Sequence, residues 1–490
     1  MISFAVALCI LLGGYLIYSK IVARICGENP LIQTPVHRLA DGVDYVVLPS
    51  WKIFLIQFLN IAGLGPIFGA IMGIMYGPAA YLWIVFGTIF AGSVHDYISG
   101  LMSIRHDGAS LPEIVGSQLG NKIKNIMRGF SLILMLLVGA VFVYNPADLL
   151  SRLTPDSFNM VFWIIVIFSY YILATLLPID KIIGKFYPLF GFALLFMAVG
   201  ICIMLFAHGE SLPEFWDGFY NHKPDPALNP IFPMMFISIA CGAISGFHAT
   251  QSPMMARCLK NEAHARPIFY GAMVAEGVVA LIWAAAVVAF TGGYENLQEY
   301  LGPNSPAVLV DKLSKDWLGT FGGILAVLGV IAAPITSGDT ALRSARLIAA
   351  DFMNLKQKSI SKRLIISVPL FILCSIIMLL PYDALWRYFA WCNQVLAVFT
   401  LWTASVWLAS RNRNYYIALV PALFMTSVTV SYILFAPEGL QGVVNNLFDI
   451  EIPYYFAVGC GIAVTAIFWG TFNRYVSLKR SEFQPASFSE

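Results

Sequence analysis

Several ionisable side chains lie inside apolar stretches of this 490-residue chain, and such groups can carry protons. A histidine titrates near neutral pH, whereas a buried carboxylate must be either paired or protonated. The candidates for proton coupling on this ground are His95, Asp96, Glu276 and Asp339. For Asp96 and Asp339 the alternative is a structural salt bridge, and the basic partners within reach are Arg105, Arg343 and Arg346. Adjacent helical residues point about 100° apart, so we expect no pairing between His95 and Asp96.

A polar stretch, "SGFHATQSP" from Ser245 to Pro253, interrupts another apolar run. A helix that begins inside the membrane offers free N–H groups, which attract a carboxylate. His248 can bind an anion or carry a proton, and the alternative is a structural histidine with satisfied hydrogen bonds. The predicted substrate-binding residues are Ser245, Gly246, His248, Thr250, Gln251 and Ser252, with Gly63 and Gly65 from an earlier stretch.

That earlier stretch, "LNIAGLGPIFGAIMG" from Leu59 to Gly73, is rich in helix-breaking residues. Each glycine costs a helix interior about 1 kcal/mol and each proline about 3 kcal/mol. The two stretches lie five spans apart, so their helices cross the membrane in opposite directions. Paired broken helices of opposite direction are typical of the binding site of a secondary transporter. The alternative is tight helix packing through Gly65, Gly69 and Gly73, which have small-xxx-small spacing.

Composition indicates how these stretches are positioned. The chain is 59% hydrophobic and only 11% charged, and apolar runs of about 20 residues recur along it. The runs do not alternate as the strands of a membrane β-barrel would. We predict an all-α membrane protein, with a retained first span rather than a signal peptide. About thirteen helices are expected at 1–20, 51–76, 78–101, 128–147, 158–178, 186–207, 231–256, 267–291, 317–342, 364–381, 385–409, 415–436 and 453–473.

Charge in the connecting segments predicts the orientation. By the positive-inside rule, the side that carries about 24 of the 29 Lys and Arg residues is the cytoplasm. The N-terminus is then outside and the C-terminus inside, in a multi-pass protein of the cell (inner) membrane. The eight cysteines have no metal-binding spacing, so neither a disulfide nor a zinc site is expected.

Several motifs resemble the carbon starvation (CstA) family of membrane transporters. They are "DGVDYV" (41–46), "NIAGLGPIFGAI" (60–71), "GSVHDYISG" (92–100), "SGFHATQSP" (245–253), "ARPIFYGAMVAEG" (265–277) and "PITSGDTALRSARLIAAD" (334–351). The resemblance implies the amino acid–polyamine–cation superfamily, a LeuT-like five-plus-five inverted repeat, and uptake of peptides or pyruvate. One N-terminal and two C-terminal helices would be additions to that repeat.

The same resemblance implies a sodium site between the first break and the eighth core helix. Ala333, Thr336 and Ser337 share one helical face, and carbonyls of Leu59 and Ala62 would face them. The alternative is that Thr336 and Ser337 bond back to their own helix. Lys181 or Lys185, at the start of the fifth core helix, would instead occupy the cation position and link coupling to protons. Sodium and protons both remain open as the coupling ion, and no other cofactor is expected.

The predicted organisation has five parts: a first helix and cytoplasmic loop (1–50), a first repeat (51–207), an outer loop (208–230), a second repeat (231–409) and two final helices with a short tail (410–490). We predict a cation-coupled symporter that imports pyruvate or a short peptide by alternating access. Its partners are that substrate and the lipid bilayer, without nucleic acid, and the oligomeric state is open. The alternative is a transporter-like nutrient sensor with a signalling partner. An enzyme is not expected, because no HExxH, GxSxG or phosphate-binding loop occurs.

Overall fold

The computed structural model describes residues 1–42, 44–176, 179–209, 212–302, 305–353, 355 and 359–483. The described chain is helical, and no β-strand occurs within these ranges. Nine of its helices are long and apolar enough to cross a membrane, or up to eleven if each of two bent pairs counts as one span. The prediction of an all-α protein with many membrane-spanning helices is therefore confirmed.

The helices occur in the following order along the chain. In the first part of the chain they are α1 (Ile2–Cys26), α2 (Pro35–Arg38), α3 (Ser50–Ile61), η1 (Gly65–Gly69), α4 (Ala70–Ile74), α5 (Ala79–Leu82), η2 (Trp83–Gly92), α6 (Ser93–Arg105), α7 (Leu111–Leu119), α8 (Asn121–Leu153), α9 (Met160–Leu176) and α10 (Ile179–His208). In the middle part they are η3 (Ile231–Met235), α11 (Phe236–Ser238), α12 (Gly246–Ala256), η4 (Glu262–His264), η5 (Arg266–Tyr270), α13 (Gly271–Thr291), α14 (Tyr294–Leu301), α15 (Pro306–Ala326), η6 (Val327–Ala332) and α16 (Ala333–Phe352). The last are α17 (Ile360–Ile377), α18 (Tyr382–Ala409), α19 (Tyr416–Phe435), α20 (Leu440–Phe448) and α21 (Tyr454–Phe483).

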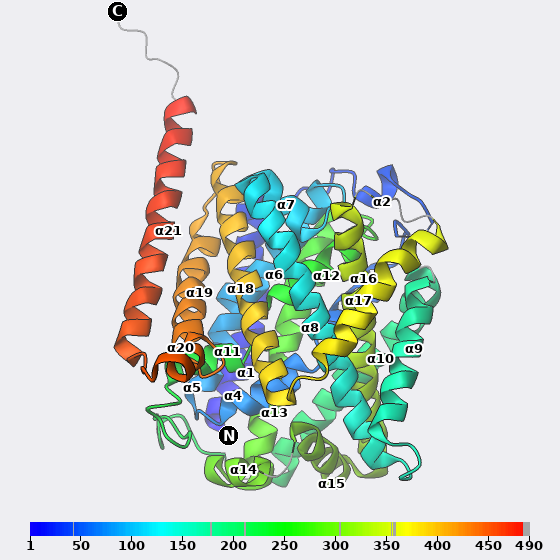
Figure 1. Ribbon diagram of the computed structural model, residues 1–490, viewed down its shortest axis with the longest axis vertical. Helices are drawn as coiled ribbons and strands as arrows, with labels where there is room; N and C mark the ends of the chain where they lie inside the picture. Colours follow the sequence, from blue (N-terminus) through cyan, green and yellow to red (C-terminus); the bar gives the residue numbers. More distant parts are fainter. Residues whose placement is uncertain are drawn as a thin grey trace, which may run out of the picture.

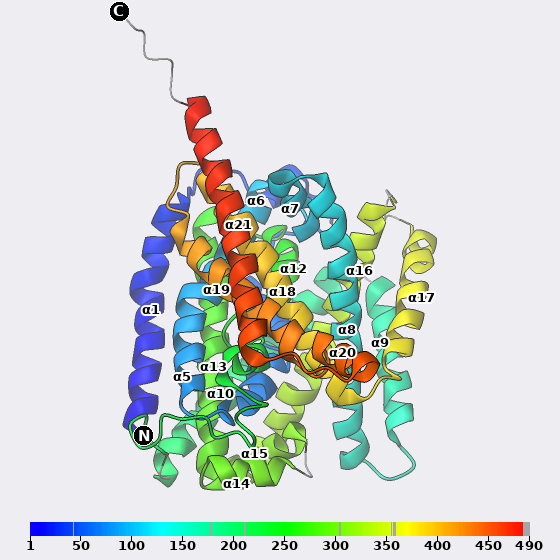
Figure 2. The ribbon, with the colours of Figure 1, turned by 60° about the vertical axis from the view of Figure 1, so that its left-hand side comes forward.

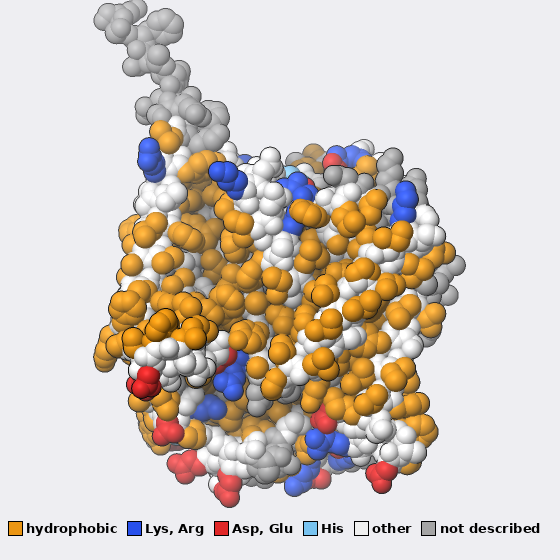
Figure 3. Space-filling model, viewed as in Figure 1, with side chains coloured by type: hydrophobic (Ala, Val, Ile, Leu, Met, Phe, Trp, Pro, Cys, Tyr) orange, Lys and Arg blue, Asp and Glu red, His pale blue; other side chains and the backbone are white. Residues whose placement is uncertain are grey.

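Figures 1 and 2 show the helices as a bundle. The N-terminus lies at the end near α14 and α15, and α21 extends beyond the opposite end. The last helix, α21, stands at the margin of the bundle and packs on α19 (Figure 1). On the face in Figure 3, hydrophobic side chains cover the middle, and most charged side chains lie toward the two ends. This distribution fits a protein whose middle is surrounded by lipid.

Both predicted helix interruptions are present. The first separates α3 from η1 at Ala62–Leu64, with a bend of 52°, and the second separates α11 from α12 at Ile239–Ser245. The two breaks face each other, because a Cβ at Gly65 or Gly73 would overlap Cys241 or Ile239. The glycines therefore serve close packing as well as helix breaking, and the two interpretations of the stretch both hold.

The span predicted at 317–342 is one of those whose bounds differ from the observed helices. The span expected at 317–342 was ended before Arg343, but α16 continues to Phe352. Arg343 and Arg346 are 1% and 3% exposed, so they lie inside the packed bundle rather than at a helix end in water. Since Arg343 donates to the carbonyl of Ala174 at 2.6 Å, protein contacts replace water around its charge.

Candidate functional site

Four ionisable side chains from three helices form a buried chain of contacts, which we call the acid–imidazole cluster (His95, Asp96, His248 and Glu276). Asp96 accepts from His95 Nδ1 at 2.7 Å and from His248 Nδ1 at 2.8 Å. The other nitrogen of His248, Nε2, lies 3.4 Å from Glu276 Oε2. All four side chains are 0% exposed. The cluster therefore links α6, α12 and α13 through titratable groups alone.

The expectation that His95 and Asp96 do not pair is wrong. Their Cβ directions diverge, but their Cα atoms are only about 3.8 Å apart. The imidazole ring is long enough to turn Nδ1 toward the neighbouring carboxylate. The second oxygen of Asp96 remains available for His248, so one carboxylate orients two imidazoles.

The alternative of a salt bridge between Asp96 and Arg105 is excluded by the partners of Arg105. Its guanidinium binds Glu262 Oε1 at 2.6 Å and donates to the carbonyl of Gly27 at 2.6 Å. Glu262 also accepts from the backbone N–H of Asn29 at 2.8 Å. Glu262 is thus the carboxylate that pairs with Arg105, whereas Asp96 contacts the two histidines.

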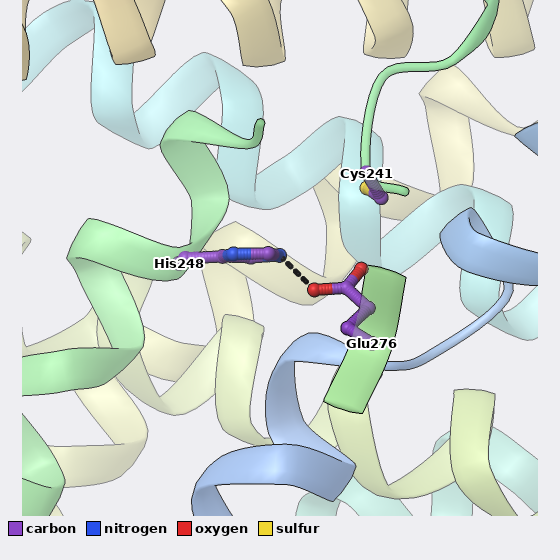
Figure 4. Close-up of side chains that lie close together, drawn as sticks. All are labelled: Cys241, His248 and Glu276. Carbon is purple, nitrogen blue, oxygen red and sulfur yellow. Dashed lines mark ion pairs between the residues drawn. The ribbon is translucent and has the colours of Figure 1, made fainter. Parts of the chain in front are cut away.

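Glu276 has the least satisfied carboxylate of the cluster. Neither of its oxygens has a hydrogen-bond partner in the described part of the chain, and its only close ionic partner there is His248. Figure 4 shows the imidazole and this carboxylate pointing toward each other, with Cys241 nearby on the second break. A buried carboxylate without hydrogen bonds is costly unless it is protonated or faces a cation.

Cys241, His248 and Glu276 together offer three atoms of the types that bind transition metals, all within 4.8 Å of one another. No sequence spacing predicts this group, because its members come from three separate segments. The Cys241 thiol is already hydrogen-bonded, donating to Ser245 Oγ at 3.6 Å and accepting from Asn393 Nδ2 at 3.4 Å. We therefore interpret the three side chains through the His248–Glu276 pair rather than as a metal centre.

The start of α12, predicted to bind a substrate carboxylate, is capped by a side chain of α18. Asn393 Oδ1 accepts from the backbone N–H of Phe247 at 2.7 Å and from Ser245 Oγ at 3.0 Å. A Cβ at Gly246 would overlap the backbone of α18, so this glycine allows the two helices to approach closely.

The carbonyls of the second break are also satisfied from α18. Asn393 Nδ2 donates to the carbonyl of Ala240 at 2.9 Å. Gln394 Nε2 donates to the carbonyls of Ala240 and Ile244, each at 3.0 Å. Sequence reasoning missed this amide clamp (Asn393 and Gln394). Its signal was a pair of adjacent amides within an otherwise apolar run.

The remaining predicted substrate residues divide into two groups. The hydroxyls of Thr250 and Ser252 donate to carbonyls of their own helix at 2.6 and 3.0 Å, at Phe247 and His248. Gln251 donates to Thr250 Oγ1 at 2.9 Å, but its Oε1 has no partner among the described residues. Two further buried amides that sequence reasoning missed, Gln57 and Asn60, lie one turn apart on α3. Neither has a hydrogen-bond partner in the described ranges.

The predicted sodium residues are brought together in part. Ser337 Oγ donates to the carbonyl of Leu59 at 3.1 Å, so α16 does meet the end of α3. Thr336 Oγ1 donates to the carbonyl of Ala333 at 2.7 Å within its own helix. The backbone N–H of Ala62 donates to the carbonyl of Phe58 at 2.7 Å. Ser337 thus makes the predicted contact with the end of α3, whereas Thr336 bonds back to its own helix, as the alternative to a sodium site expects.

The last two predicted proton carriers are Asp339 and Lys185. Asp339 accepts from the hydroxyl of Tyr187 at 2.8 Å and is fully buried. Lys185 belongs to α10, but its side chain lies outside the described residues, as does that of Lys181.

A row of aromatic rings, which we call the aromatic barrier, runs from the first break to the start of α12. Its ring centroids are 5.5 to 6.3 Å apart, and its members in order are Phe68, Trp386, Phe389, Phe142 and Phe247. The ring of Phe142 also covers Gly63, whose Cβ would stand 3.1 Å from it. The predicted substrate residues are buried as well.

Comparison with known proteins decides the family. The model of the family "Carbon starvation protein CstA" matches residues 1–162, 151–316 and 305–432. The chain belongs to the carbon starvation protein CstA family. The resemblance inferred from the sequence motifs is therefore confirmed.

Relatives within the CstA family include transporters. An uncharacterized membrane protein of Haemophilus influenzae is 45% identical over 348 residues, which is 61% of this chain and 92% of that protein. The pyruvate/proton symporter BtsT of Escherichia coli is 27% identical over 61% of this chain and 52% of its own length. The peptide transporter CstA of the same organism is 26% identical over 67% of this chain and 55% of its own. The chain spans about half the length of the curated transporters it matches.

Solved structures agree on the fold of this CstA-family chain. A manganese transporter of Eremococcus coleocola aligns with a TM-score of 0.54 at 13% identity, covering 91% of this chain and 99% of that one. MHP1, a nucleobase-cation-symport-1 family transporter, aligns with a TM-score of 0.53 at 13% identity, covering 88% and 93%. These are transporters of the LeuT fold, so the likeness shows that architecture alone.

Proposed function

We propose that this protein is a proton-coupled secondary transporter that imports a small carboxylate, such as pyruvate or a short peptide, by alternating access. The proposal includes thirteen membrane spans, a five-plus-five inverted repeat, an external N-terminus and a cytoplasmic C-terminus. The acid–imidazole cluster is the observation that carries the coupling. The two facing helix breaks support the transport mechanism, because such breaks mark the midplane site of secondary transporters.

The cluster is built to hold a proton. Two carboxylates without any proton would place two negative charges at buried positions, at a cost of several kcal/mol each. A neutral His248 that donates from Nδ1 to Asp96 would turn a lone pair on Nε2 toward Glu276. That contact is favourable only if a proton lies on Nε2 or on the carboxylate. One proton shared by His248 and Glu276 therefore completes the cluster.

Substrate contact is assigned to the unpartnered amides beside the breaks. Gln57 and Asn60 on α3 and Gln251 on α12 are buried with unused donors or acceptors. Unsatisfied buried amides cost about 1–3 kcal/mol each, which a polar ligand would recover. A carboxylate or peptide group provides both the acceptors and the donors that these side chains lack.

Binding and release of the proton would follow from movement of α12. His248 is the third residue of this helix, directly after the second break. A small change in the angle of α12 alters its distances to Asp96 on α6 and to Glu276 on α13. The conformation that holds both contacts favours the protonated cluster, and the one that separates them favours the deprotonated cluster.

The test is uptake of labelled pyruvate and of labelled dialanine into proteoliposomes, with proton and sodium gradients imposed separately. We expect accumulation of at least one of the two substrates when the outside is acid, and none with a sodium gradient alone. Accumulation driven by sodium at equal pH would refute proton coupling. Binding without any uptake under either gradient would favour the nutrient-sensor alternative.

A further inference from the structure

A cavity of about 360 Å³ is lined by Phe68 and Trp386, at one end of the aromatic barrier, and by no member of the acid–imidazole cluster. Both broken segments contribute to its wall, through Phe68 of η1 and Met234 of η3. Other parts of the wall come from α18, α19 and the loop that precedes η3. The cavity therefore touches the elements that an alternating-access mechanism moves, while it lies outside the buried substrate residues.

The charges that line this cavity do not balance. Arg387 and Lys223 bring two positive charges, and Glu438 brings one negative charge. Arg387 Nη1 lies 3.3 Å from Glu438 Oε2, so this pair accounts for one charge of each sign. Lys223 Nζ lies 5.7 Å from the centre of the Tyr76 ring and 3.9 Å from Met75 Sδ. In the described part of the chain, no carboxylate lies within ion-pair distance of Lys223.

Lys223 is held in an electrostatically unfavourable place. Burial and the positive charge of Arg387 lower the pKa of Lys223 in this outer loop. Lys223 is only partly buried and lines the cavity without a carboxylate partner among the described residues, so its ammonium group is available to an anion that enters there. The rest of the wall is mostly aromatic and apolar, with Tyr76, Phe68 and Trp386 among its members.

We propose that this cavity is a vestibular binding site for the carboxylate group of a short peptide, held by Lys223 and Arg387 before the peptide passes the aromatic barrier. The identity of the ligand as a transported substrate rests on the proposed function. One carboxylate neutralises the excess positive charge, and the aromatic wall receives the apolar part of the ligand. The cavity is at the lower end of the usual range for small-molecule sites, about 300–1,000 Å³, which suits a di- or tripeptide.

The test uses the full chain, purified in detergent, and measures the change in tryptophan fluorescence when a ligand binds. Only the part of this change that disappears in Trp386→Phe is counted, because Trp386 lines the cavity. The probes are dialanine and dialanine amide, which differ only in the carboxylate. We expect dialanine to bind at least tenfold more tightly than the amide. Lys223→Gln should weaken dialanine about tenfold and leave the amide unchanged. The matched control is Lys312→Gln, because Lys312 lies over the Tyr300 ring and does not line the cavity.

Three results would overturn the assignment. They are equal binding of dialanine and its amide, equal affinity in Lys223→Gln and wild type, and equally effective displacement of dialanine by inorganic phosphate. In proteoliposomes, Lys223→Gln should raise the KM for peptide uptake and leave the maximal rate unchanged. A protein that bound dialanine through Lys223 but transported nothing would refute the proposed function and leave the binding site in place.

Discussion

Replacing Glu276 by glutamine tests the acid–imidazole cluster most directly. The substitution keeps the shape of the side chain and imitates its protonated form, but it cannot exchange a proton. Since neither carboxylate oxygen of Glu276 has a hydrogen-bond partner in the described residues, the change removes little that holds the fold together. We expect the thermal stability of Glu276→Gln to stay close to that of the wild type, because a neutral glutamine beside a neutral His248 leaves no unpaired charge at this contact.

The magnitude of the coupling effect follows from the distance. A full charge on His248 and one on Glu276, separated by 3.4 Å, attract each other by about 5 kcal/mol at an effective dielectric constant of about 20. Loss of that attraction lowers the population of the proton-loaded cluster on the order of 10³-fold. Proton-driven accumulation in proteoliposomes should therefore fall at least 100-fold. Exchange of labelled for unlabelled substrate, which needs no net proton movement, should persist.

Glu262→Gln is the matched control, because Glu262 is equally buried but serves a structural ion pair. Its loss leaves Arg105 without its carboxylate, which costs about 3–5 kcal/mol of stability. We expect this variant to unfold at lower temperature and to keep its ratio of protons to substrate. Undiminished proton-driven accumulation in Glu276→Gln, with wild-type proton stoichiometry, would refute the role of the cluster.

Three other predictions concern the aromatic barrier, sodium as the alternative coupling ion, and the ion pairs of Glu113 on α7. Phe142→Ala should open a leak across the aromatic barrier, measured as substrate efflux without a proton gradient. Uptake should be insensitive to sodium both in the wild type and in Ser337→Ala, whereas a sodium response of the wild type that is lost in Ser337→Ala would support the predicted sodium site. Burial acts to raise the pKa of Glu113, but hydrogen bonds from Lys124 and Arg128 outweigh it and lower this pKa. The carboxylate therefore stabilises the fold above about pH 4.3, by about 1 kcal/mol after solvent screening, and this contribution disappears as pH falls through the lowered pKa. Thermal unfolding of Glu113→Gln and wild type should accordingly differ at pH 7 and converge in acid.

Much of the fold followed from the sequence because the bilayer allows few alternatives. Apolar runs of sufficient length must be helical, since every backbone polar group needs a partner within its own segment. The two breaks were predictable for the same reason, because glycine and proline at such density weaken a helix wherever they occur. The end of α16 was not predictable, since the burial of Arg343 depends on helices that are distant in the sequence.

The site was predicted as a set of residues but not as an arrangement. His95, Asp96, His248 and Glu276 were each recognised from a titratable group in an apolar run. That they touch one another depends on how α6, α12 and α13 pack, and spacing along the chain contains no such information. The amide clamp was missed because asparagine and glutamine carry no charge, so they attract less notice in an apolar run than a histidine does.

The cap on the second helix break and the acid–imidazole cluster meet at adjacent residues of α12, and this proximity supports the proposed proton coupling. The clamp from α18 binds the backbone N–H of Phe247, and the next side chain, His248, belongs to the acid–imidazole cluster. Any tilt of α12 that lengthens the His248 contacts must also strain the Asn393 cap. Under the proposed coupling, a change in the charge of the cluster would act on the same turn of helix that fixes the break, without the need for a long pathway between separate sites.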